Sequence, residues 1–175
     1  MNKVIIASMI VVVMLAGCQP KESSDNQTPT AAIEAQRKEA ARKLTAQAMV
    51  FLGQQKYQDA VGALDAAIKF DPSNQDPYLL LGQILLKAGE YERAVDFLDN
   101  AAKNFSDNGM MFYMLGIANR MDGKKLPAVL AARRSFEIFK AANDQDGAQK
   151  AALLLEQIAN APDDKLKKAD KAAAK

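Results

Sequence analysis

The order of apolar and polar residues divides the chain into four stretches. Residues 4–15 form an apolar run without a charge, and residues 19–30 are polar, with two prolines and no large apolar side chain. From 31 to 161, apolar residues recur at intervals of three and four, which is the period of an amphipathic helix. Residues 162–175 are rich in lysine, alanine and aspartate. We therefore expect an apolar leader, a solvated tether, one helical domain and a charged tail.

Turn-forming residues divide the helical stretch into predicted helices. Asp71-Pro72 ends one helix, because proline disfavours the helical conformation of the residue before it. Asp76-Pro77 begins the next, with Asp76 as N-cap and the proline in the first turn, where no N–H is needed. Residues 144–147 are interpreted as a loop and a further N-cap. The predicted helices cover 31–54, 57–70, 75–88, 91–104, 109–122, 126–142 and 146–160.

A constant repeat spacing relates successive helix pairs. It aligns Leu64 with Leu98, and it aligns Ala48 with Gly82 and Gly116. Small residues thus recur where two helices must approach closely, and large apolar residues recur where the gap is filled. The pattern is clearest in the segments GQQKYQDAVGALDAAIKFDP (53–72) and KAGEYERAVDFLDNAAKNFS (87–106).

This pattern resembles the tetratricopeptide repeat, whose period of about 34 residues it matches. The resemblance covers about 41–142 and implies an all-α domain over 31–161. That domain would be a right-handed superhelix of antiparallel helix pairs, with about three repeats and a C-terminal capping helix. The third repeat departs from the pattern, because Lys125 stands where the earlier repeats have tyrosine. Residues 133–136 fit better if its second helix is shifted by about one turn.

The apolar run at the start ends in Leu15-Ala16-Gly17-Cys18. A basic start, a short apolar stretch and small residues at the cut are typical of a secretory signal, and the run is too short to span a bilayer. The four residues resemble the lipobox of bacterial lipoproteins. The resemblance implies that the signal peptide 1–17 is removed, that Cys18 is lipidated, and that 18–30 tethers the domain. The alternative is a chance cysteine after an ordinary signal.

The residue that follows this cysteine bears on location. Residue 19 is glutamine, not the aspartate that marks inner-membrane retention in enterobacteria-like sorting. If the source is a Gram-negative bacterium, the family rule implies lipid anchoring in the outer membrane, facing the periplasm. Cys18 is also the only cysteine in the chain, so no intramolecular disulfide can form.

The concave face is the predicted binding surface, since the first helix of each pair lines it in this family. All five methionines beyond the signal lie on first helices, and their flexible side chains suit an apolar partner; packing in the core is the alternative, above all for Met111 and Met114. Transferred repeat by repeat, the groove comprises Met49, Leu52, Asp76, Leu79, Gln83, Leu86, Met110, Tyr113, Ile117 and Met121, together with Arg42, Thr45, Lys87 and Arg120.

The groove lacks the charged clamp of chaperone-binding members of the family, which hold a C-terminal carboxylate with Lys, Asn and Arg. At the matching places this chain has Thr45, Met49, Leu80, Met110 and Met114. We therefore expect the partner to be a helix or an extended segment with apolar anchors, rather than a peptide with an acidic tail.

Composition argues against catalysis and against nucleic acid. The chain has no histidine, and lipidation would consume its single cysteine, so neither a Ser-His nor a Cys-His pair can be built. Its net charge of +2 gives no electrostatic case for nucleic acid. We predict that the protein is not an enzyme and needs no cofactor or metal. A glycan hydrolase that uses two carboxylates is an alternative, although the predicted groove holds only Asp76.

These observations favour a membrane-anchored adaptor for protein partners of the cell envelope. Within that class the chain resembles small repeat lipoproteins that assemble type IV pili or secretion complexes. A scaffold for peptidoglycan-modifying enzymes is an alternative within the same class. A homodimer formed through the exposed strip is a further one.

Overall fold

A computed structural model describes residues 29–161 of the chain. The predicted signal peptide, Cys18, all but the end of the predicted tether, and the charged tail lie outside these residues. Between 29 and 161 the chain forms seven α-helices and no β-strand, which confirms the predicted all-α fold. None of these helices is long and apolar enough to cross a membrane.

The helices begin and end within two residues of the predicted boundaries. The first begins at Pro29, inside the expected tether. The helices are α1 (Pro29–Gly53), α2 (Tyr57–Phe70), α3 (Asp76–Lys87), α4 (Tyr91–Asn104), α5 (Gly109–Met121), α6 (Lys125–Ala141) and α7 (Gln145–Ala159).

Side-chain caps fix where two of these helices begin. Asn108 Oδ1 accepts a hydrogen bond from the Met111 N–H at 2.9 Å, at the start of α5. Asp144 caps α7 in the same way, as predicted, by accepting from the Gly147 N–H at 2.8 Å. The predicted N-cap role of Asp76 is wrong by one residue, because Asp76 is already the first residue of α3.

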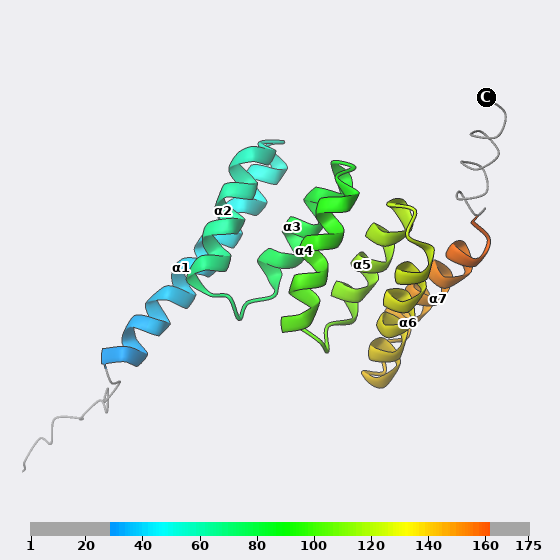
Figure 1. Cartoon of the computed structure of the whole chain (residues 1–175). Helices are drawn as coiled ribbons and strands as arrows, with labels where there is room; N and C mark the ends of the chain where they lie inside the picture. Colours follow the sequence, from blue (N-terminus) through cyan, green and yellow to red (C-terminus); the bar gives the residue numbers. More distant parts are fainter. Residues whose placement is uncertain (1–28, 162–175) are drawn as a thin grey trace, which may run out of the picture.

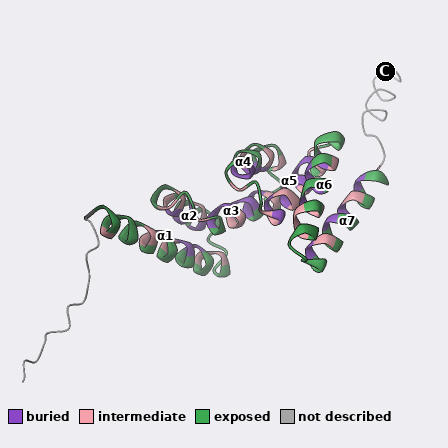
Figure 2. Ribbon diagram, turned by 90° about the horizontal axis from the view of Figure 1, so that it is seen from below, coloured by how far each residue is buried: buried purple, intermediate pink, exposed green. Residues whose placement is uncertain are grey.

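The helices are arranged as antiparallel pairs in two layers. Figure 1 shows the pairs α1–α2, α3–α4 and α5–α6 in succession, with α7 after the third. Seen from below in Figure 2, the first helices of the pairs and α7 lie in one layer, and α2, α4 and α6 lie in the other. The layer of α1, α3, α5 and α7 carries the predicted binding surface, and we call its outer side the first-helix face.

Large side chains of neighbouring helices pack onto small ones. A Cβ atom on Gly82 would lie 2.7 Å from Leu98 Cδ2, and one on Gly116 would lie 3.0 Å from Leu154 Cδ2. Ala48, at the equivalent position of α1, is fully buried. The recurrence of small residues in the sequence therefore reflects close helix approach, as expected.

The third pair keeps the register of the first two, so the predicted one-turn shift of its second helix is wrong. Ala128, Ala132 and Ser135 are buried in α6, and each occupies the repeat position of a buried residue of α4. The third pair differs in length instead, since α6 has 17 residues and α4 has 14. Both helices begin at the same repeat position, so α6 continues for almost one turn beyond the place where α4 ends.

Candidate functional site

On α3, the predicted site residues share one side of the helix. Asp76, Leu79, Gln83 and Leu86 recur at intervals of three and four residues and are exposed or half-buried. The opposite side of α3 is buried. The sequence therefore places these four side chains on the first-helix face.

On α5, the same arrangement holds. Met110, Tyr113 and Ile117 are half-buried, and Met121, one turn further along, is 46% exposed. Met110 and Tyr113 pack against the same core cluster as Leu79 and Leu86 of α3. The two helices therefore present one apolar strip.

On α1, the predicted residues lie apart from this strip. Met49 is 59% exposed, and Leu52 is half-buried against a cluster that also includes Leu81 and Ile84 of α3. The backbone of α1 nevertheless makes no more than marginal contact with that of α3, whereas α3 packs on α5 and α5 on α7. Thr45 does not contribute to the face, because it is buried and its hydroxyl donates to the Ala41 carbonyl at 2.9 Å. The predicted groove is thus continuous over α3 and α5 and interrupted before α1.

Two of the methionines belong to the core. Met111 is fully buried and Met114 is 3% exposed. Met114 lies over Gly82, where a Cβ atom would come within 2.8 Å of its terminal methyl group. Met49, Met110 and Met121 remain on the surface as candidates for partner contact.

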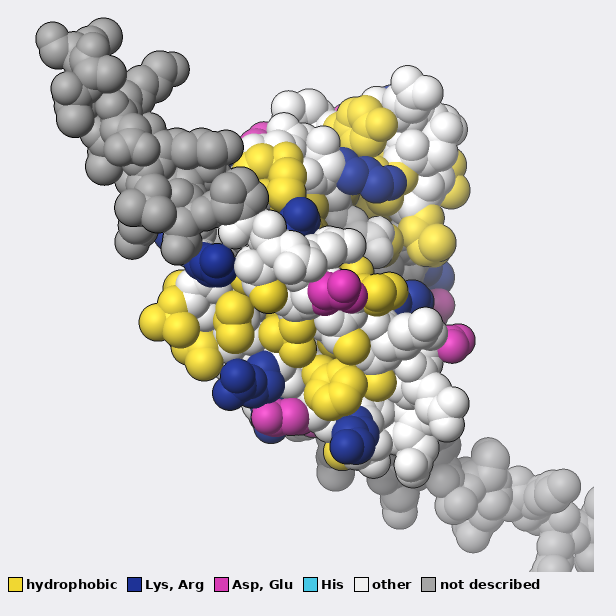
Figure 3. All heavy atoms as spheres, turned by 90° about the vertical axis from the view of Figure 1, so that its right-hand side faces the viewer, with side chains coloured by type: hydrophobic (Ala, Val, Ile, Leu, Met, Phe, Trp, Pro, Cys, Tyr) yellow, Lys and Arg dark blue, Asp and Glu magenta, His cyan; other side chains and the backbone are white. Residues whose placement is uncertain are grey.

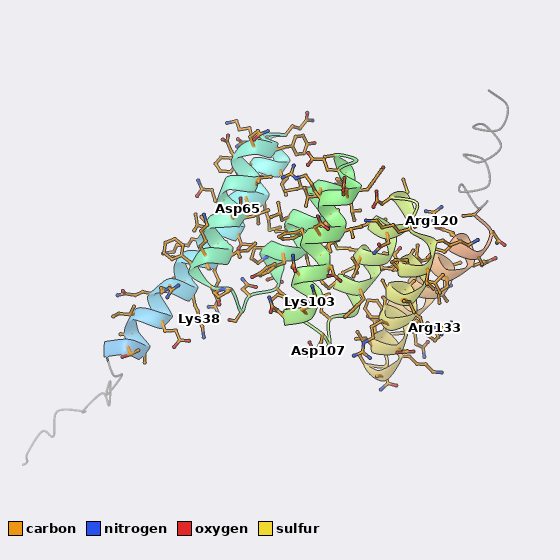
Figure 4. The ribbon with its side chains drawn as sticks, in the orientation of Figure 1. Lys38, Asp65, Lys103, Asp107, Arg120 and Arg133 are labelled. Carbon is orange, nitrogen blue, oxygen red and sulfur yellow. The ribbon has the colours of Figure 1, made fainter. Side chains whose placement is uncertain are left out.

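The structure extends the face onto α7, which sequence transfer missed. Leu153 is 49% exposed there and lines a pocket of ≈ 530 Å³ between α5 and α7. Arg120 of α5 also lines it, at the end of the molecule where Figure 4 labels this residue. Because α6 is longer, α7 does not follow the repeat spacing. The groove positions could therefore be carried over by sequence only as far as α5. The pocket is lined by Arg120, Leu153, Glu156, Gln157, Asn160 and Ala161.

A second pocket, of ≈ 590 Å³, lies between the first and second pairs, where α2 faces α3 and α4. Val61, Ile84 and Phe97 contribute apolar walls, and Tyr57, which is 53% exposed, also lines it. Nothing in the sequence pattern indicated this pocket. Within residues 29–161 no group of three or more Asp, Glu, His or Cys side chains could hold a metal ion.

These features define a class of protein, an all-α repeat domain with an apolar strip along one layer of helices. The family model described as "Tetratricopeptide repeat" matches residues 45–109 and 79–145, which together span more than half of the chain. The chain belongs to the tetratricopeptide repeat family. Domains of this family are generally modules for protein–protein interaction, and no catalytic family is indicated.

Solved structures are similar in fold at low sequence identity. The complex of the TPR2B domain of yeast Sti1 with pHsp70 has a TM-score of 0.64 at 14% identity, and the similarity covers 69% of this chain and 97% of that one. The first repeat domain of Spaghetti (RPAP3), bound to the HSP90 peptide SRMEEVD, gives 0.61 at 16%, covering 70% and 92%.

A bacterial structure is similar to the same degree. The type III secretion translocator chaperone SycD of Yersinia enterocolitica has a TM-score of 0.61 at 20% identity, covering 74% of this chain and 95% of that one. No curated protein matches the sequence.

Proposed function

We propose that the protein is a lipid-anchored adaptor that holds a protein partner of the cell envelope against the first-helix face. The observation that carries the proposal is the apolar strip of α3 and α5, which α7 extends at Leu153. Apolar side chains held half-exposed along a rigid layer offer area to bury against a partner. The family's general role in protein interaction supports the same interpretation.

The chemistry of the strip indicates what kind of segment it holds. Of the predicted groove residues on α3 and α5, Asp76, Lys87 and Arg120 are charged, and Lys87 lines the pocket between the first and second pairs. A clamp for a terminal carboxylate, of the kind that the acidic HSP90 peptide of the Spaghetti complex suggests, would need several cations there. An amphipathic helix or an extended segment with apolar anchors fits better.

The proposed location rests on the sequence. Leu15-Ala16-Gly17-Cys18 matches a lipobox in composition and in place, and the glutamine at 19 favours the outer membrane. Several acyl chains on Cys18 would hold the domain stably, whereas one chain would hold it only marginally. Changing Cys18→Ala should move the protein from the membrane fraction to the soluble or unprocessed fraction.

Within this class we favour assembly of a secretion complex or pilus, and the similarity in fold to a secretion chaperone supports that choice. A scaffold for peptidoglycan-modifying enzymes is the alternative. The captured protein decides between them: a component of a secretion pore or pilus supports the first, and a cell-wall hydrolase supports the second.

Photocrosslinking in cells tests the face directly. A photoreactive residue at position 83 should capture the partner, because Gln83 is exposed in the middle of the α3 side of the strip. The matched control is position 58, since Gln58 is also exposed but lies on the opposite layer, on α2. Equal capture of one protein from both positions contradicts the proposal.

Substitution provides the second test. Leu153→Glu and Met121→Glu place a charge on exposed parts of the face and should leave the fold intact while lowering capture at least tenfold. Circular dichroism checks the fold. If both variants capture the same protein as the wild type does, the face is not the binding surface.

A further inference from the structure

The outward side of α6 differs in chemistry from the same side of the earlier second helices. Leu126 is 69% exposed and Leu130 is 57% exposed, one turn apart on the helix. In α4, one repeat earlier, the same positions hold Glu92 and Asp96. The same two repeat positions thus carry acids in α4 and exposed leucines in α6.

Basic residues accompany these leucines. Residues 124–140 contain five basic side chains and one acidic side chain. Arg133 and Lys140 continue the stripe of Leu126 and Leu130 at helical spacing. Arg133, labelled on α6 in Figure 4, has no hydrogen bond or ion pair to any residue between 29 and 161. Arg134 beside it is held by Glu137 at 3.8 Å and donates to the Ser106 carbonyl.

The leucines lie at an accessible end of the molecule. Figure 3 looks onto the end formed by α6 and α7 and shows hydrophobic side chains gathered there, with Lys and Arg and a few Asp or Glu side chains among them. The Lys125 ammonium donates to the Ala161 carbonyl at 3.3 Å, which fixes the start of α6 beside the end of α7.

We propose that this end of the domain, the outward side of α6, is a second, peripheral contact with an anionic membrane. Leu126 and Leu130 enter the interfacial region of the bilayer, and Arg133 and Lys140 bind lipid phosphates. Exposed apolar side chains flanked by cations are what such a surface recognises. The proposal rests on the proposed lipid anchor only for its setting, because the anchor keeps the domain close to the bilayer and raises the effective concentration of the contact.

Charge favours a lipid surface over a second copy of this chain. In a dimer that pairs two α6 sides about a two-fold axis, the cations of one chain would lie near the same cations of the other chain, and like charges repel. Within one chain, Glu92 and Asp96 of α4 would repel an anionic surface, so the attraction to such a surface is confined to α6. An anionic bilayer meets the cations of α6 without that conflict.

Vesicle binding tests the proposal on a chain that begins at Gln19, which keeps every described residue and lacks the lipidated cysteine. It should cosediment with vesicles of phosphatidylglycerol and phosphatidylcholine, should not do so with phosphatidylcholine alone, and should be released as salt rises. Leu126→Glu with Leu130→Glu should abolish binding. Arg133→Gln should weaken it about fivefold, the fold-change for one cation near an anionic surface.

The control variant is Gln58→Glu, which adds an acid at the α2 position equivalent to Leu126 and should leave vesicle binding unchanged. Absence of binding, or equal binding to both vesicle types, overturns the proposal. A dimer that Leu126→Glu dissociates in sedimentation, without any vesicle binding, assigns the surface to a second copy instead. None of these failures affects capture from position 83, so they are distinct from failure of the adaptor function.

Discussion

Between the second and third helix pairs, α4 and α5 pack around the largest apolar cluster of the described chain, which runs from Tyr78 to Ala131. Between the first and second pairs the cluster is smaller, α1 barely meets α3, and a pocket of ≈ 590 Å³ remains beside α2. We call the interface between two successive pairs a joint. Both joints are built from the same repeat pattern, and α2 and α4 have the same length. The repeat spacing thus determines where the helices begin and end, but it does not determine how tightly successive pairs pack against each other.

One repeat position accounts for much of the difference. It is Phe105 after α4 and Phe139 in α6, but Asp71 after α2. The Phe105 ring packs edge-on to Tyr78 of its own pair at 5.1 Å and also packs against the cluster shared with α5, and Phe139 lies against Gly109 and Gly147. Asp71 instead accepts a hydrogen bond from the Ser73 hydroxyl at 2.6 Å. An aromatic ring fills the later joints, and the first joint has a solvated turn in its place.

The difference has a consequence for stability along the chain. In a solenoid, each pair is stabilised by its own packing and by its contacts with its neighbours. The pair α1–α2 has only one neighbour, and its joint with that neighbour is the looser one. We therefore expect α1 and α2 to open at lower free energy than α3 to α6, and to exchange their amide hydrogens faster.

Truncating two leucines at the same repeat position should give the largest loss of stability. Leu98 and Leu64 occupy the same repeat position and both are fully buried. Leu98→Ala should cost about 3–5 kcal/mol, because its surroundings are closely packed, and Leu64→Ala about 2–3 kcal/mol, because α2 can relax toward the pocket. Urea unfolding measures both. Equal losses would mean that the two joints are equally tight.

Removing the aromatic ring should weaken the closed joint. Phe105→Ala should cost about 2 kcal/mol, less than for a fully buried phenylalanine because this ring is half-buried. Amide exchange should then accelerate in α3 and α4 toward the rates of α1 and α2. Phe70→Ala is the control, since Phe70 is 43% exposed next to the first joint and should change little. A matching loss at both positions would contradict the role given to Phe105.

Removing the helix cap between the second and third pairs should give a smaller loss of stability. Asn108 caps α5, and its Nδ2 also donates to Gln75 Oε1 at 2.6 Å, so it links the loops before α3 and α5. Asn108→Ala should cost about 1 kcal/mol. Gln75→Ala removes the link but keeps the cap, and should cost less. If Gln75→Ala costs as much as Asn108→Ala, the link matters more than the cap.

The helices were predictable because residues close in sequence determine where each helix ends. Pro72, Gly89 and Gly123 stop or turn the chain wherever they occur, and the two glycines adopt φ of 74° and 75°. The register of α6 was wrongly predicted from its charged residues. Arg133 and Arg134 suggested a shift, but the buried alanines of α6 were the better guide, since small residues fit the spacing that α5 imposes.

The candidate site was predictable only where the repeat holds. Transfer of positions placed Leu79 and Tyr113 correctly on one face. It could not show the gap beside Met49, because that gap depends on how pairs pack and not on the pattern within a pair. It also missed Leu153, because the longer α6 breaks the spacing before α7. Distances between repeats are tertiary properties, which a period in the sequence does not encode.

The smallest predicted effect concerns pH at Tyr78 of α3, whose hydroxyl donates to the carbonyl of Pro72, in the loop between α2 and α3, at 3.4 Å. Burial, and secondly the nearby Asp71 carboxylate, raise the pKa of Tyr78 above its ordinary 10.0. The folded state thus favours the neutral phenol, so this contribution to stability is complete below the unfolded pKa and is lost as pH rises through the folded one. Unfolding free energies from about pH 9 to about pH 11 should fall more steeply in the wild type than in Tyr78→Phe. Tyr57→Phe, at an exposed tyrosine, should keep the wild-type slope, and a slope unchanged in Tyr78→Phe would show that Asp71 and burial do not act on this phenol.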